Sequence, residues 1–576
     1  MSISRVSGLR QTRPASWLRT TYQTARHSIA APTLLGVAGV ALALALLLIP
    51  SFPWDMRLPC YLIILVWTIL RPRLALYLMA FAVPWGSLDF ISVSSLRLNS
   101  ADILVAFLAI GWLMSWALPA SMGGGRDREQ GRVPAYLVTA ILLLIGVMLL
   151  SMTVAISKTD SLKEISKWLE FIVLITLGTQ YLRTRRHVWT LVFFIVAAAI
   201  TQAFFGYAQA IFNLGPQSFV RASNLRVYGT FQQPNPYAGY LNMSLVITLA
   251  LLLLGRDWLT RLLAGIATGL IGGAFLLTQS RGGQVALLAA LLFIILIGIR
   301  SIRVWMRIII IGLFAAVGGF LAGVIPLSVF NQVDHFLGLS GISLTNPTTQ
   351  DYSTAERLAH WIAGLQMYMT HPILGVGIGN YPDVYSHYYI TIFVNSLGQA
   401  HNYYINIAAE TGTIGLLVYL FFIASMLGAS GYAVSQVCKQ RAQVRTQIPH
   451  TRKRILAPLA RRDKLILLLR PARFLAYYRR QERYELFGRL TNDRALAIGL
   501  MAAVITICVH NLVDDLYDHS LTNLMALLLI ALISLGRVTS NGDGADSQET
   551  LALTDNTLSA YASKKVEVMA QTKLKR

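Results

Sequence analysis

The sequence predicts an all-α polytopic membrane protein with about fourteen transmembrane helices and a large extracytoplasmic loop. Apolar residues make up 55% of the 576 residues, charged residues make up only 13%, and the mean hydropathy is +0.57. An ordinary soluble domain carries about 25% charged residues. This composition excludes a disordered protein, a coiled coil and a typical cytosolic enzyme.

A helix crosses the hydrocarbon core with roughly 20 apolar residues. The first apolar run follows a basic segment but lacks a small-residue cleavage site, so we expect an uncleaved span rather than a signal peptide. The second and third runs are short. The predicted spans are residues 31–50, 58–70, 74–90, 101–119, 134–156, 165–182, 188–213, 236–255, 262–278, 284–299, 308–330, 403–436, 495–510 and 520–536.

Basic clusters alternate with these runs. If every run crosses once, all the clusters fall on one side, and Lys and Arg concentrate in cytoplasmic loops. We therefore expect both termini, the basic segment 1–30 and the polar tail 537–576, to be cytoplasmic. The clusters are Arg5 to Arg26, Arg71/Arg73, Arg126/Arg128/Arg132, Arg183/Arg185/Arg186, Arg256/Arg261 and Arg300/Arg303/Arg307.

The largest basic block, residues 437–494, separates the span at 403–436 from the last two spans at 495–536. It holds sixteen Lys and Arg residues against four acidic residues. Basic and apolar residues alternate, which is typical of an amphipathic segment on anionic lipid headgroups. A net charge of +23 would suggest nucleic acid in a soluble chain. Here the block is tethered at a membrane without a reader motif, so no nucleic acid is expected.

Residues 331–402 form the longest outward loop after the first eleven spans, residues 31–330. Arg357 is its only Lys or Arg residue. The stretch TAERLAHWIAGLQMYMTHP predicts a helix that Pro372 ends. Its expected packed face consists of Leu358, Trp361, Ile362, Leu365 and Met369.

Four outward segments together resemble the O-antigen ligase/polymerase family. They are GTFQQPNPYAGY (229–240), LLTQSRGG (276–283), ERLAHWIAGLQMYMTHPILGVGIGNY (356–381) and AHNYYINIAAETGTIGLL (400–417). All four occur in the family's order, and the resemblance covers roughly residues 190–430. The block 437–494 departs from the family.

The resemblance implies a GT-C-like membrane glycosyltransferase that acts without a metal or other cofactor. Such proteins transfer a glycan from an undecaprenyl-pyrophosphate carrier at the outer (periplasmic) face of the inner membrane. The acceptor is lipid A core in ligases, a second lipid-linked glycan in polymerases, and a protein hydroxyl in some relatives. Nothing in this sequence names the acceptor, although the block 437–494 slightly favours a polymerase or exopolysaccharide role.

The chemistry of two arginines fits this activity. A pyrophosphate leaving group gains negative charge as the glycosidic bond breaks, and arginine stays charged and binds phosphate through two donors. Arg281 and Arg357 are the candidate cations. Arg281 could instead be an interface anchor whose charge snorkels to the headgroups. Arg221 and Arg226 are weaker candidates for the same anion or for lipid headgroups.

The acceptor hydroxyl must lose a proton, and histidine is the usual base near neutral pH. His401 occupies the family's H-N position and is the candidate base, with Asn402 as the residue that orients it. A helix-capping histidine is the structural alternative.

Three further residues are candidates for substrate contact. Asn235 lies in a rigid turn between two prolines, and a purely structural turn is equally compatible with it. Gly377 lies in HPILGVGIGN, where glycine permits a tight turn or a close approach to the glycan or lipid. Tyr403 belongs to a group of tyrosines that either stack on sugars or form the interfacial aromatic belt.

The acidic segment around Asp514, Asp515 and Asp518 has two interpretations. With His510 and His519 it could hold a divalent cation, or it could contact arginine or sugar. We expect the second, and assign no metal ligands. The three cysteines lack the spacing of a zinc site or a disulfide scaffold.

Two rival functions remain at this point. A transporter, for example a bicarbonate permease, fits the many spans, but we see no internal repeat and no ionisable groups at mid-membrane. A scaffold for other envelope enzymes would leave Arg281, Arg357 and His401 without a common role.

Overall fold

The computed structural model describes ten segments of the chain, which leave out the predicted spans 31–50 and 308–330, the basic segment 1–30 and most of the polar tail. The segments are residues 54–88, 90–93, 96–117, 133–221, 224–299, 343–348, 352–390, 392–447, 471–518 and 520–540.

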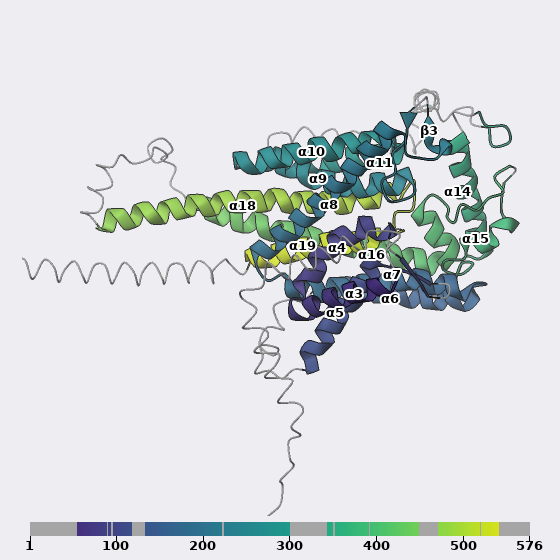
Figure 1. The fold of residues 1–576 in the computed structure, drawn as a ribbon, viewed down its shortest axis with the longest axis horizontal. Helices are drawn as coiled ribbons and strands as arrows, with labels where there is room; N and C mark the ends of the chain where they lie inside the picture. The colour runs from purple at the N-terminus through teal and green to yellow at the C-terminus, as the bar shows by residue number, and fades with distance from the viewer. Residues whose placement is uncertain are drawn as a thin grey trace, which may run out of the picture.

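Helices dominate these residues (Figure 1). The first half of the chain contains α3 Trp54–Leu70, α4 Arg73–Trp85, α5 Ser100–Ala117, α6 Ala135–Ser151, α7 Lys158–Tyr181, α8 Arg185–Phe212, α9 Pro234–Leu254, α10 Trp258–Leu277 and α11 Arg281–Gly298. The second half contains α14 Tyr352–Thr370, α15 Tyr381–Val384, α16 Tyr403–Thr446, α18 Pro471–His510 and α19 Leu521–Ser540. Two antiparallel hairpins pair β1 Phe90–Val93 with β2 Leu96–Asn99, and β3 Val220–Arg221 with β4 Asn224–Leu225.

Every predicted span that falls on described residues coincides with a helix. Eight of the described helices are long and apolar enough to cross a membrane, and α3, α4 and α5 are shorter apolar helices. The helix α7 does not meet this criterion. Its first half carries Lys158, Asp160, Lys163, Glu164 and Lys167, which lower its hydropathy. The chain is a multi-pass membrane protein, and the count of fourteen spans stays a prediction.

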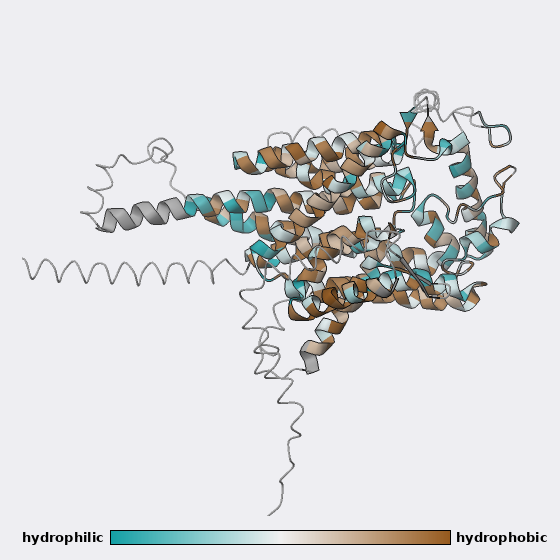
Figure 2. Cartoon of the chain, viewed as in Figure 1, coloured by the Kyte–Doolittle hydropathy of each residue, from teal (hydrophilic) through white to brown (hydrophobic). Residues whose placement is uncertain are grey.

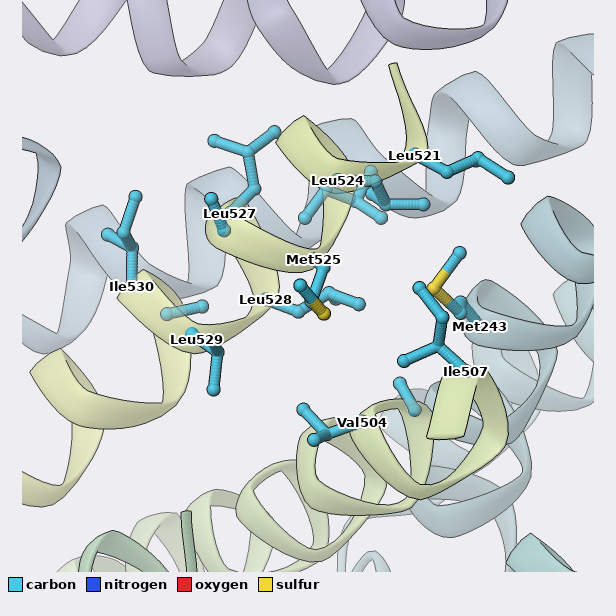
Figure 3. Close-up of a cluster of buried hydrophobic side chains, with 14 of the residues drawn as sticks. Met243, Val504, Ile507, Leu521, Leu524, Met525, Leu527, Leu528, Leu529 and Ile530 are labelled. Atoms are coloured by element: carbon cyan, nitrogen blue, oxygen red, sulfur yellow. The ribbon is translucent and has the colours of Figure 1, made fainter. Parts of the chain in front are cut away.

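The centre of the bundle consists of α9, α18 and α19. Within their most apolar windows, 78%, 78% and 89% of residues are buried, against 28% for α10 and α11. Met243 of α9, Val504 and Ile507 of α18, and a run of leucines of α19 contribute to the same apolar core (Figure 3). A helix buried on all sides needs apolar residues on every face, which explains why α9 and α18 lack an amphipathic pattern.

Three of the predicted basic clusters lie on described residues, and they meet at one end of the bundle together with Arg494 and Arg537. Their contacts join positions that are far apart in the sequence. The pairs are Arg73 with His187, Arg185 with Asp493, Asp257 with Asn492, Arg494 with the Gly298 carbonyl, and Arg537 with the Leu182 carbonyl.

The helices α16 and α18 extend beyond this end (Figure 1). α18 begins at Pro471 and not near residue 495, so residues 471–494 continue a bundle helix and do not form a separate segment lying along a surface. The coloured part of this extension, residues 483–494, is mostly hydrophilic, in contrast to the bundle (Figure 2). Arg441 of α16 donates a hydrogen bond to Thr491 of α18 at 3.0 Å, which links the two extensions. Residues 448–470 lie outside the described part of the chain.

The elements α14, α15 and β3 gather at the opposite end of the bundle from the tip of α18 (Figure 1). Reporter fusions at residues 350 and 450 are therefore expected to report opposite sides of the membrane, with 450 in the cytoplasm, because positive charge marks the cytoplasmic end. Fluorescent and alkaline phosphatase fusions at both positions measure this. The same side for both would show that the span count and the placement of the site are wrong.

Candidate functional site

The predicted helix in the outward loop exists as α14, but it packs through a different face. Leu365 and Met369 are 45% and 77% exposed, whereas the buried residues are Ala355, Ala359, His360, Ala363, Gly364 and Met367. Small side chains repeat every four residues on this face, so the helix backbone approaches α16 closely. The periodicity of the large apolar residues was therefore the wrong guide to the packed side.

Backbone hydrogen bonds join two glycine-containing segments, the loop after α14 and the first part of α16. The loop after Pro372 runs along the kink of α16 at Gly412, where the Val376 and Gly377 amides donate to the Ala409 and Glu410 carbonyls, both at 3.0 Å. The buried Glu410 carboxylate accepts from the Tyr381 amide at 3.1 Å. The glycines of the two family-like segments thus lie where the loop and α16 pack against each other.

Gly377 packs against the chain's own backbone. Its φ is +106°, and a Cβ atom there would lie 2.5 Å from the Ala155 Cα. This contact gives the residue a structural role and does not require a ligand.

We expect Gly377→Ala to lower stability by about 1–3 kcal/mol or more, because the methyl group overpacks a backbone contact and the left-handed φ is strained. Gly398→Ala is the matched control, since Gly398 has a φ of +85° but no atom within 4 Å of the added Cβ. Thermal unfolding of both variants separates the steric cost from the conformational cost. Equal losses in the two variants would contradict close packing at Gly377.

His401 lies immediately before α16 and has a φ of +53°, an uncommon conformation for a residue other than glycine. Asn402 caps the helix, because its side-chain oxygen accepts from the Tyr404 and Ile405 amides at 3.0 and 3.2 Å. The Tyr403 amide donates to the Asn511 carbonyl at 2.9 Å, which ties this turn to the connection between α18 and α19. Asn402 therefore fixes the turn that carries His401.

Asp514 joins His401 to Arg357. Its Oδ1 lies 3.3 Å from His401 Nδ1, and its Oδ2 lies 3.7 Å from an Arg357 terminal nitrogen. Burial acts to raise the pKa of Asp514, but the hydrogen bond and charge of His401, together with the charge of Arg357, lower that pKa to about 2. The carboxylate is thus ionised at neutral pH. In the neutral tautomer whose Nδ1–H donates to this carboxylate, the lone pair of the imidazole lies on Nε2. The alternative in which this acidic segment contacts arginine is confirmed for Asp514.

His360 of α14 supports His401 from the other side. The two rings meet edge to face with centroids 5.6 Å apart, and His360 stacks on Tyr385 at 4.7 Å. Burial, and then the charge of His401, lowers the pKa of His360 to about 4. His360 is therefore neutral at pH 7 and packs beside the site without adding charge to it. The Trp361 indole donates to the His401 carbonyl at 3.2 Å, which joins α14 to the turn.

Arg281 begins α11, where Ser280 caps the helix by accepting from the Gly283 amide at 3.3 Å. Its side chain is exposed. A Cβ atom on the adjacent Gly282 would lie 2.6 Å from Val513 and 3.2 Å from His510 Nε2. The start of α11 therefore packs on the segment that carries Asp514, which brings Arg281 to the same end of the bundle as Arg357.

Arg226 and Asn235, two candidates for substrate contact, form a hydrogen bond with each other. Arg226 donates to the Asn235 side chain at 3.1 Å and to the Thr278 carbonyl at 3.0 Å, so it links two of the family-like segments. Arg221 ends β3, and its side chain lies outside the described part. Tyr403 is only 3% exposed, which directs its ring into an aromatic cluster and away from any substrate. These positions favour structural roles over substrate contact.

The acidic residues that follow α18 have different partners. Asp518 pairs with Lys167 at 2.7 Å, whereas Asp514, four residues earlier on the same connection, contacts His401. His519 lies outside the described residues, and the described ones contain no group of three His, Cys, Asp or Glu side chains arranged to hold a metal ion. Sequence reasoning did not find the pairing of His401 with Asp514, because 113 positions separate the two and no local pattern links them.

Comparison with known proteins gives one family. Residues 266–420 match the family described as O-antigen ligase. The matched range contains Arg281, Arg357 and His401, but ends before Asp514. No curated protein matches the chain.

Proposed function

We propose that this membrane protein is a glycosyltransferase that moves a glycan from an undecaprenyl-pyrophosphate carrier to an acceptor hydroxyl at the outer face of the inner membrane, because residues 266–420 match the family described as O-antigen ligase. The observation that carries the proposal is the contact of one carboxylate, Asp514, with both a histidine and an arginine. A base for a hydroxyl and a cation for a phosphate are the two groups that this reaction needs.

His401 acts as the general base in this proposal. Nε2 takes the proton of the acceptor hydroxyl while the hydroxyl oxygen forms a bond to the anomeric carbon of the donor sugar. The bond between that carbon and the phosphate oxygen breaks, and its electron pair leaves with the undecaprenyl pyrophosphate. Asp514 stabilises the imidazolium that forms, as the carboxylate does in a serine protease triad.

Arg357 and Arg281 stabilise the leaving group. The 3.7 Å separation from Asp514 is longer than a hydrogen bond, so the Arg357 fork keeps donors for a second anion. Its side chain is 23% exposed, which leaves it accessible at the end of the bundle. Arg281 is exposed at the start of a helix, where the helix dipole also favours phosphate.

The transporter alternative is not favoured.

The proposal is tested with the purified full-length protein and a synthetic undecaprenyl-pyrophosphate oligosaccharide as donor. Mass spectrometry detects the lengthened or newly joined glycan. We expect transfer to persist after chelation of divalent cations, because arginines supply the positive charge. Absence of transfer together with solute uptake by sealed vesicles would contradict the proposed function. Loss of transfer with chelator and rescue by Mg²⁺ would contradict its metal independence.

A further inference from the structure

A second polar group lies beside the connection between α18 and α19, away from His401. Lys167 of α7 contacts Glu164 at 2.6 Å and Asp518 at 2.7 Å. The side chains of Lys167 and Glu164 are 27% exposed and that of Asp518 is 45% exposed, so solvent and solutes reach them. We name this group, with the residues added below, the Lys167 cluster.

The inner part of the Lys167 cluster contains Asp102 of α5, Glu170 of α7 and Asn523 of α19. The two carboxyl groups interact electrostatically with each other, and the Asp102 carboxylate accepts from the Asn99 amide at 2.9 Å. The Asn523 amide nitrogen donates to Glu170 at 3.0 Å. Asn523 is 1% exposed, and its side-chain oxygen has no hydrogen-bond partner among the described residues. A buried acceptor without a donor is costly, and a hydroxyl or amine of a ligand would satisfy it.

The charges of the Lys167 cluster indicate the class of ligand. Lys167 supplies the only basic side chain among the six residues of the cluster, against the carboxyl groups of Glu164, Asp518, Asp102 and Glu170. Such a surface repels a diphosphate. Carboxylates and an amide oxygen accept hydrogen bonds from vicinal hydroxyls or from an amino group, which are the donors that a sugar presents.

The Lys167 cluster lies close to the candidate site. Asp514 and Asp518 are four residues apart on one connection, so their Cα atoms are at most about 14 Å apart. Tyr517 lies between them in sequence and contacts both Tyr403 and Trp168, with ring centroids 4.5 and 5.2 Å apart. Trp168 adjoins Lys167, and Tyr403 follows His401 by two residues. A short oligosaccharide can therefore contact both groups.

We propose that the Lys167 cluster is a subsite for the acceptor glycan, which it binds through the hydroxyl or amino groups of uncharged or amino sugars. The donor is held by its diphosphate near the arginines, whereas the acceptor brings only hydroxyls and needs a site of its own beside the base. The inference rests on the proposed function, because it assigns a role to a substrate of that reaction.

The test uses full-length protein in lipid nanodiscs and two readouts. The probe is the free oligosaccharide repeat unit, released by mild acid from the surface polysaccharide of the source organism, and saturation-transfer NMR measures its binding. Transfer kinetics then give kcat and the KM values for acceptor and donor. The variants are Glu170→Gln, Asp518→Asn and Asn523→Ala, and Asp383→Asn is the matched control because Asp383 is an exposed acid of α15.

We expect each cluster variant to weaken probe binding and to raise the acceptor KM by at least about tenfold, with kcat and the donor KM unchanged and Asp383→Asn like wild type. Unchanged probe binding in Asn523→Ala, which leaves every ion pair in place, would overturn the subsite even if Asp518→Asn fails to fold. Loss of wild-type probe binding on chelation of divalent cations would also overturn it. If wild type binds the probe but transfers nothing, the proposed function fails and the subsite stands.

Discussion

His401→Ala is expected to lower the transfer rate by about 10²–10⁴ while protein yield and donor binding stay close to wild type. The physical reason is the loss of the general base. Among the described residues at this end of the bundle, His401 is the histidine that the Asp514 carboxylate contacts and orients. Turnover of a lipid-linked donor, measured beside thermal stability of the purified variant, gives both quantities. His387→Ala is the control, because His387 is an exposed histidine on the same end.

The structure also defines how the His401 prediction can fail. The imidazole contacts a buried acid and packs on His360, so a structural histidine would show itself as loss of folded protein in His401→Ala. A well-folded variant that remains active would remove His401 from the mechanism. Asp514→Asn keeps the shape but not the charge, and we expect an intermediate loss of rate, because the carboxylate orients the base and stabilises its protonated form.

The apolar pattern predicted most of the fold. Length and hydropathy located every span that the structure describes, because burial in lipid or in a helix bundle imposes continuous apolar runs. Charge alternation predicted that Arg73, Arg185 and Arg494 share one end, which the contacts to His187, Asp493 and Gly298 confirm. These properties follow from local sequence alone.

The site was less predictable, since it depends on contacts between distant segments. Nothing in the sequence near His401 indicates that Asp514 approaches it. Nothing in GVGIGN distinguishes a loop that binds a ligand from a loop that packs against Glu410. The packed face of α14 was mispredicted because close approach through Ala359 and Ala363 replaces burial of large side chains. Small residues give a weak hydropathy signal even where they decide the packing.

Arg357→Lys is expected to be badly impaired, and Arg357→Ala inactive, although both keep α14 folded. Lysine preserves the charge but lacks the planar fork that binds two phosphate oxygens, and loss of one such stabilising donor commonly costs about 10²–10³ in rate. Donor binding and transfer are measured for both variants. Lys163→Ala is the charge control, because Lys163 forms an exposed pair with Asp160 that contributes about 0–1 kcal/mol.

A structural alternative for Arg357 follows from its contact with Asp514. Removing the arginine leaves that carboxylate buried with one cation fewer, which can cost about 3–5 kcal/mol of stability and mimic a catalytic defect. The double variant Arg357→Ala with Asp514→Asn separates the two roles. Asp514→Asn alone is the reference for this variant, because it already lacks the carboxylate that orients His401. If Arg357 only neutralises Asp514, the double variant folds and transfers as fast as Asp514→Asn alone. If Arg357 binds the pyrophosphate, the double variant folds but remains inactive, because no other Lys or Arg lies between residues 331 and 402 to replace it.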